Sequence, residues 1–163
     1  MGKEGDQIFL PPSRRNNAPR VSPDWPTFVV ETGDRKLRSA AAWWLNQSEG
    51  LVRMVLLVSI NTNVVDFELW MLAPPNTPRP LPGGYIDALR NYPALLPPTA
   101  RQLANNQQPY SQCEVEVSAN SVPYGPMVLP FEALYDISPL PGSGEIDVVL
   151  SIPEFQDFVF VLF

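Results

Sequence analysis

The sequence predicts a single domain of the α/β (α+β) class, in which a mixed central β-sheet is flanked by helices. Its 163 residues are enough for one domain with a sizeable core. Apolar, β-branched runs at 27–32, 51–60 and 64–72 are typical of strands. A segment with the apolar spacing of a helix lies between the first two runs, so the class combines helices and strands.

The N-terminal region differs in composition from the rest. Residues 1–24 are polar and Pro-rich, which predicts a flexible arm preceding a globular domain at 25–163. Proline makes up 20 of the 163 residues, more than twice the usual share of about 5%. Many of these prolines fall between Pro74 and Pro98, where we expect mostly irregular structure.

The most ordered signal is "PTFVVETGDRKLRSAAAWWL", residues 26–45. Its first part predicts a strand over Thr27–Thr32, short and apolar enough to be buried on both faces. Gly33 turns the chain, and Asp34 is a favourable N-cap for a following helix. That helix has a buried stripe at i, i+4, i+7 and i+8, formed by Leu37, Ala41, Trp44 and Leu45.

Two further strands follow this helix. Leu51–Ile60 is almost entirely apolar, as a central strand is, and Val64–Leu72 alternates between apolar and polar residues. In the second strand the polar face carries Asp66, Glu68 and Trp70. The short link "NTN" between the two strands predicts a hairpin.

The rest of the chain has shorter elements. "YIDALRN", "TARQLANNQ" and "LPFEALYDI" predict short helices, and 112–119 and 144–151 predict strands. Cys113 falls on the apolar side of the first of these strands, as a small core residue does. A last helix is predicted from Ile152, because Ser151 and Glu154 have the spacing of a capping box and Pro153 lies in the first turn.

Composition excludes several kinds of chemistry. The chain has no histidine and a single cysteine, Cys113. A Ser-His-Asp triad, a Cys-His pair, a His-ligated zinc site and a thiolate cluster are therefore excluded. Any catalysis must use carboxylates, Lys, Tyr or Ser, with Mg²⁺ as the most fitting cofactor because carboxylates hold hard cations.

The net charge of −6 disfavours a general nucleic-acid binder, since phosphate contacts need a basic surface. A local basic group is formed by Arg35, Lys36, Arg38 and Arg53, and Trp43 offers a ring on which a base would stack. These residues are candidate contacts to nucleic acid or to a protein partner. The alternative is that they form an ordinary charged face.

No targeting or membrane segment is visible in the sequence. The N-terminus lacks the apolar core of a signal peptide, and the longest apolar run, Met54–Ile60, is too short to span a bilayer. With one cysteine and no disulfide framework, the expected compartment is intracellular, cytoplasmic or nuclear.

Several of these segments resemble a widespread group of uncharacterised fungal proteins. The resemblance rests on "PTFVVETG", "LRSAAAWWLNQSEGLVRMVLLVSIN" and "FELW", and downstream on "LPFEALYDI" and "GSGEIDVVLSIPEFQDF". That group is in turn similar to the PD-(D/E)XK restriction-endonuclease-like superfamily. The resemblance implies a restriction-endonuclease-like core over residues 25–160 and the chemistry of a Mg²⁺-dependent nuclease.

The superfamily motif matches this chain only in part. Pro26 and Glu31 match the proline and the glutamate of the motif, but Thr27 stands where the motif has a metal-binding aspartate. The resemblance implies Glu31 as a metal ligand and catalytic residue, and Lys36 or Arg38 as the basic residue on the helix, with Lys36 as the catalytic candidate. Asp34, Asp66 or Glu68 would serve as the second carboxylate if the fold brings one of them close to Glu31, and Asp34 is the candidate second ligand.

Three functions remain open from the sequence. The first is a degenerate nuclease-like domain that acts as a binding or accessory protein. The second is an active Mg²⁺-dependent nuclease that uses Glu31 and Lys36, and the third is an accessory protein that retains the fold for structural reasons only. A second carboxylate close to Glu31 would favour the enzyme.

Overall fold

A computed structural model of the chain describes residues 4–15, 25–33, 36–92, 101–118, 121–122 and 124–162. It is a single α+β domain built on a five-stranded mixed sheet with the strand order β1-β2-β3-β4-β5. No helix among the described residues has the length and apolarity that a membrane crossing needs. The sheet strands are β1 (Gln7–Phe9), β2 (Phe28–Gly33), β3 (Met54–Ile60), β4 (Val64–Leu72) and β5 (Pro109–Ser118).

The centre of the sheet is a β2-α2-β3 unit. Helix α2 (Leu37–Gln47) joins β2 to β3, which pair in parallel from Phe28↔Met54 to Gly33↔Ser59. Parallel neighbours need such a crossover connection, and a helix is the usual one. The helix buries Ala41, Trp44 and Leu45, which lie on one side of it at helical spacing.

Strands β3, β4 and β5 form an antiparallel meander. The link at 61–63 closes the predicted hairpin between β3 and β4, and β5 pairs along the whole of β4. The pairing of β4 with β5 shifts between Leu69 and Trp70. The predicted alternation in β4 is confirmed, because Val65, Phe67 and Leu69 join the main core while the residues between them lie on the opposite face.

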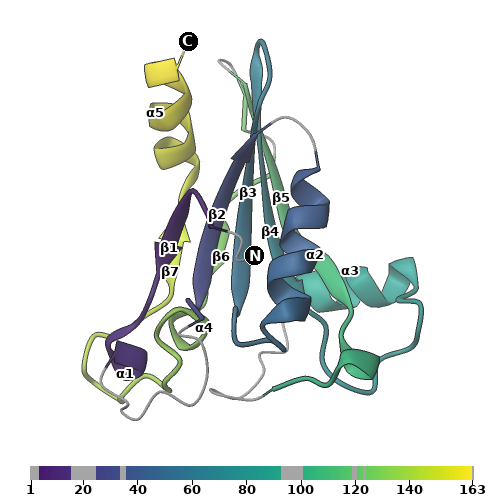
Figure 1. Cartoon of the computed structure of the whole chain (residues 1–163). Helices are drawn as coiled ribbons and strands as arrows, with labels where there is room; N and C mark the ends of the chain where they lie inside the picture. The colour runs from purple at the N-terminus through teal and green to yellow at the C-terminus, as the bar shows by residue number, and fades with distance from the viewer. Residues whose placement is uncertain are drawn as a thin grey trace.

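Two hydrophobic clusters lie on the two faces of the sheet. The smaller one joins α2 to Val29, Val55 and Leu57. The larger one packs the other face against the hairpin β6 (Met127–Leu129) with β7 (Val148–Leu150), and against α4 (Phe131–Tyr135) and α5 (Ile152–Leu162). Figure 1 shows α2 to the right of the sheet and β7 and α5 to its left.

Part of the predicted N-terminal arm contributes to the fold. Strand β1 pairs antiparallel with β2, from Gln7↔Val30 to Phe9↔Phe28, and forms one edge of the sheet. The short helix α1 (Pro12–Arg15) follows it. The sequence did not predict β1, because a strand of three residues at the edge of a sheet is too short to show an alternating apolar pattern. The rest of the predicted arm, 16–24, lies outside the described residues.

Other expectations are corrected in detail. The N-cap of α2 is Lys36, with φ 62°, rather than Asp34, which lies outside the described residues. The predicted helix in "TARQLANNQ" is a single 3-10 turn, η1 (Ala104–Asn106), in the described part of that segment. The helix α3 (Gly83–Asn91) covers "YIDALRN" as predicted, and Ser151 and Glu154 form the predicted cap of α5.

Candidate functional site

The glutamate of the motif lies near the end of β2 and faces α2. Glu31 is 8% exposed, and its Oε1 accepts a 2.5 Å hydrogen bond from the indole Nε1–H of Trp44. Because Trp44 is itself in the core beneath α2, the carboxylate points into the interface between β2 and α2. This bond occupies one of the acceptor sites of the carboxylate and holds the side chain against the helix.

The registers of the sheet show where other carboxylates lie relative to Glu31. Glu31 is opposite Leu57 on β3, Leu57 is opposite Glu68 on β4, and Glu68 is opposite Glu114 on β5. These four residues therefore share one face, in one row across the sheet. Glu68 is two strands away from Glu31, roughly 10 Å at the usual strand spacing, with the buried Leu57 between them.

Glu68 has its own partners. Arg38 of α2 donates to it from Nε (3.1 Å to each oxygen) and from a terminal nitrogen (2.8 Å to Oε1). Trp70 Nε1–H donates to the other oxygen at 2.8 Å. Glu68 thus binds the exposed side of α2 to β4, while Glu31 binds the buried side of α2 to β2. The hydrogen bond with Glu68 raises the pKa of Arg38 above its ordinary value.

The neighbouring row of the same face is also acidic. Asp66 on β4 is opposite Glu116 on β5, and Asp66 accepts a hydrogen bond from the Asn61 side chain at 3.1 Å. Across the described ranges, no three His, Cys, Asp or Glu side chains are grouped as a metal ion would need. The alternatives Asp66 and Glu68 therefore do not complete a carboxylate cluster with Glu31.

The other predicted catalytic residue lies at the start of α2. Lys36 occupies the N-cap position in a left-handed conformation and is exposed. The predicted second ligand Asp34 and the predicted contact residue Arg35 both lie outside the described residues. Glu31 and Lys36 are thus five positions apart across the turn, the first buried against Trp44 and the second on the surface.

Thr27, in the place of the motif's aspartate, is fully buried. Its Oγ1 donates to the Leu134 carbonyl at 2.5 Å, with the Phe9 carbonyl at 3.4 Å, and its backbone N–H donates to Phe9 O at 3.0 Å. Its own carbonyl accepts the backbone N–H groups of Arg53 and Met54. Two carbonyl oxygens around this side chain suit a hydroxyl donor and not a carboxylate, which only accepts.

The prediction that Arg53 belongs to a surface contact group is wrong. Arg53 is 6% exposed, and its Nε lies 3.8 Å from Asp136 Oδ1. Burial lowers the pKa of Arg53, an effect that Asp136 opposes. Arg53 thus lies in the interior beside Asp136, which follows α4, while Arg38 remains exposed beside Glu68.

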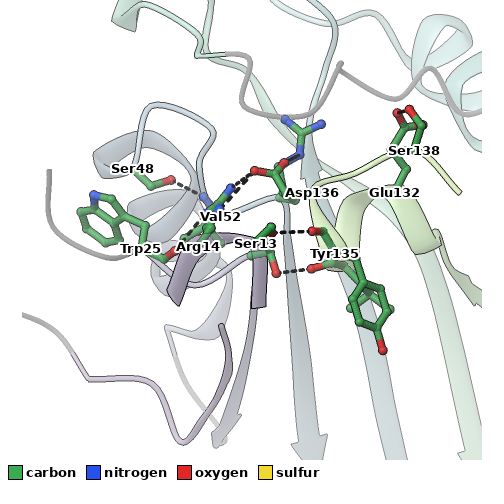
Figure 2. A network of polar contacts seen from close by, with 12 residues as sticks. Ser13, Arg14, Trp25, Ser48, Val52, Glu132, Tyr135, Asp136 and Ser138 are labelled. Atoms are coloured by element: carbon green, nitrogen blue, oxygen red, sulfur yellow. Dashed lines mark hydrogen bonds and ion pairs between the residues drawn. The ribbon is translucent and has the colours of Figure 1, made fainter. Parts of the chain in front are cut away.

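Asp136 joins the N-terminal segment to the rest of the domain. Arg14 donates to Asp136 Oδ2 from Nε (3.1 Å) and from a terminal nitrogen (2.8 Å), and to the Trp25 carbonyl at 2.8 Å. The hydroxyl of Ser13 donates to the Tyr135 carbonyl at 2.9 Å. Figure 2 shows Arg14 reaching toward Asp136, with Ser13 beside Tyr135. No sequence pattern links these residues, because they lie more than a hundred positions apart.

Trp43, the predicted stacking platform, is half-buried in a cluster of three tryptophans. Its ring meets those of Trp25 and Trp44 in edge-to-face contacts, with centroids 6.1 and 5.1 Å apart. Such contacts stabilise aromatic groups in a core. The cluster joins the segment before β2 to α2, so its first role is packing.

Pockets lie on two parts of the described structure. One, of about 520 Å³, lies over β5 and is lined in part by Arg90, Cys113, Glu114 and Tyr124. Arg90 is paired there with Glu114 at 2.7 Å, and burial raises the pKa of the Cys113 thiol, which disfavours its thiolate form. The other, of about 290 Å³, lies between β1, β2 and α4.

Comparison with known proteins returns no family model, no curated protein and no solved structure that matches the chain.

Proposed function

We propose that this chain is a catalytically degenerate relative of the restriction-endonuclease-like superfamily, and that it acts by binding a partner rather than by cleaving nucleic acid. The mixed sheet with its β2-α2-β3 unit supports the fold assignment, together with Pro26 and Glu31 in the motif's spacing. The state of the motif residues supports the loss of activity.

The observation that carries the proposal is that Thr27 and Glu31, the residues at the two ligand positions of the motif, are buried and hydrogen-bonded within the domain. Thr27 is fully buried and donates to a backbone carbonyl, while Glu31 is buried and accepts from Trp44. Metal-dependent phosphodiester cleavage needs two or more carboxylates that converge on an accessible cation. The described residues do not fit Mg²⁺, because the motif's first ligand is replaced and the second faces the core.

The charges on the sheet also oppose nucleic acid. The face that continues from Glu31 toward β5 carries Glu68 and Glu114 in one row and Asp66 and Glu116 in the next. Glu68 and Glu114 are paired there with Arg38 and Arg90, so this face offers no excess of positive charge to a phosphate backbone. Of the basic residues proposed as contacts, Arg53 is buried and Arg38 is engaged by Glu68. A protein or a small molecule is therefore a better partner class than DNA or RNA.

A cleavage and binding assay tests the proposal. The purified chain is incubated with single- and double-stranded DNA and RNA in Mg²⁺ and in Mn²⁺, and metal binding is followed by calorimetry. We expect no metal-dependent cleavage and no saturable heat with either cation. Glu31→Gln, which keeps the shape of the side chain, is the test variant, and Glu114→Gln, in the same row of the sheet, is its matched control.

The opposite result is equally well defined. If metal-dependent cleavage is observed, and Glu31→Gln abolishes it while Glu114→Gln does not, the active nuclease reading is correct and the proposal falls. If both variants cleave like the parent chain, Glu31 takes no part in the cleavage. Activity that stays in constant proportion to the protein through a second purification would then also overturn the proposal, whereas activity that separates from the protein comes from a contaminant. Circular dichroism of each variant shows that the fold is retained.

A further inference from the structure

The pocket between β1, β2 and α4 is almost entirely apolar. Its walls are the side of the sheet at its β1 edge and the end of α4, and the five residues that form most of it are Phe9, Phe28, Val30, Leu134 and Tyr135. Gln7 and Ile8 are the other described residues of the lining. None of these seven described residues carries a charge, which favours a neutral ligand over an ion.

Two of the aromatic rings of this pocket, those of Phe9 and Tyr135, are packed against other rings. The Tyr135 ring stacks on Phe131 with centroids 4.5 Å apart and meets Phe9 edge-to-face at 5.4 Å. The backbone of Tyr135 accepts the Ser13 hydroxyl, and the next residue, Asp136, binds Arg14. The N-terminal segment is thus tied to α4, and both pocket walls are preorganised, which lowers the cost of binding.

Size separates a small molecule from a protein partner. The pocket volume of about 290 Å³ lies at the lower end of the range for small-molecule sites. A stable protein interface needs roughly 800 Å² from each partner. Among the lining residues only Ile8, at 58% exposure, is a strongly exposed large apolar side chain. The lining by itself therefore provides less apolar surface than a protein would need to dock.

We propose that this pocket is a binding site for a small, neutral, flat apolar molecule of one or two rings. Such a ligand would lie against the Phe9, Phe28 and Tyr135 rings, where aromatic contacts add to the burial of apolar area. The Tyr135 hydroxyl and the Gln7 amide are the polar side-chain groups of the lining. The inference deepens the proposed binding role, but it does not depend on the resemblance to nucleases.

The test uses indole as the probe and indole-3-carboxylate as its charged counterpart. Methyl NMR of the full chain is recorded during titration with each compound. We expect saturable shifts at the methyl groups of Ile8, Val30 and Leu134, with a Kd of about 1 mM or tighter for indole. The carboxylate should bind at least about tenfold more weakly, because its charge would have to be desolvated in the pocket.

A pair of matched variants locates the site. Val30→Phe fills the pocket from β2 and should weaken indole binding at least about tenfold. Val149→Phe adds the same volume on β7, at a side chain that is exposed and does not line the pocket, and should leave binding unchanged. If Val30→Phe does not fold, the methyl shifts of the parent chain decide the question by themselves.

Three results would overturn the inference. The first is the absence of saturable shifts at the methyl groups of Ile8, Val30 and Leu134. The second is a folded Val30→Phe chain that binds indole with the same Kd as the parent chain. The third is self-association, measured by sedimentation, that Val30→Phe abolishes, since a second copy would then occupy the pocket. None of these results bears on the cleavage assay, so a failure here is distinguishable from a failure of the non-catalytic role.

Discussion

The indole N–H of Trp44 and the carboxylate of Glu31 are joined by a 2.5 Å hydrogen bond in the interior of the domain. This contact fixes α2 on the sheet, because Trp44 lies on the buried stripe of the helix and Glu31 lies on β2. The residue that the sequence marks as a metal ligand therefore serves as an attachment point for a helix. The contact also leads to a first prediction about stability.

Trp44→Phe should lower the free energy of unfolding by about 2–3 kcal/mol, because it leaves a buried carboxylate without one of its donors. Glu31→Gln keeps an oxygen acceptor and should change stability by no more than about 1 kcal/mol. Urea denaturation followed by circular dichroism measures both. A larger loss in Glu31→Gln than in Trp44→Phe would mean that the charge of Glu31, and not its bond to Trp44, matters most.

Restoring the motif's aspartate should damage the fold rather than create a metal site. Thr27→Asp places a carboxylate against the Leu134 carbonyl, and an uncompensated buried charge costs about 3–5 kcal/mol. Thr27→Ser keeps the hydroxyl donor and is the control, with a loss of about 1 kcal/mol. Thermal unfolding with and without Mg²⁺ measures the effect. A Thr27→Asp chain that folds and is stabilised by Mg²⁺ would contradict the proposed function.

Asp136 should be one of the most sensitive positions in the chain. Its side chain is 1% exposed and lies between Arg14 and the buried Arg53, so Asp136→Ala removes the carboxylate from two cations. We expect a loss of about 3–5 kcal/mol in unfolding free energy. Arg14→Ala should cost about 1–3 kcal/mol, since Asp136 then retains Arg53.

The neighbouring Arg15 provides a control for the Arg14 contact. Arg15 is exposed and donates to the Leu10 carbonyl within its own segment, so Arg15→Ala should change stability by about 0.5 kcal/mol or less. Limited proteolysis gives a second measurement. Arg14→Ala should speed cleavage within residues 4–15, and equal cleavage in both variants would show that Arg14 does not hold this segment.

Alkaline pH should destabilise the domain through Tyr110. Burial raises the pKa of Tyr110 to about 12, whereas the unfolded chain releases the phenol proton near pH 10. Above that pH the unfolded state binds fewer protons than the folded state, so stability falls as the pH rises, by on the order of 2 kcal/mol by pH 12. Tyr110→Phe should lose this part of the pH dependence, measured as the difference between the two chains from pH 8 to pH 11.5.

The local pattern of the sequence was sufficient for the elements around the site. The alternation in Val64–Leu72 and the stripe of Ala41, Trp44 and Leu45 led to the observed strand and helix, because each pattern has the period of its element. The strand β1 was missed since an edge strand of three residues has no periodicity. Asp34 was assigned the N-cap from residue preference alone, and the structure has Lys36 there.

The basic group shows a different failure. Arg38 and Arg53 are close in sequence, but the first is exposed beside Glu68 and the second is buried beside Asp136. The different environments of the two arginines depend on the positions of α2 and β3. They depend also on Asp136, which follows α4 and lies far from Arg53 in the sequence. A count of charges in a sequence window contains no information about such partners.

By itself the sequence determined the α+β class, the order of the main strands and helices, and the exclusion of imidazole and thiolate-cluster chemistry, because periodicity and composition are local properties. Only the tertiary structure decided the role of the motif residues. Thr27 meets Leu134 and Glu31 meets Trp44 because strand register and helix packing bring these side chains together. Whether a carboxylate can hold a cation depends on its burial and its neighbours, and both are set by contacts between residues distant in the chain.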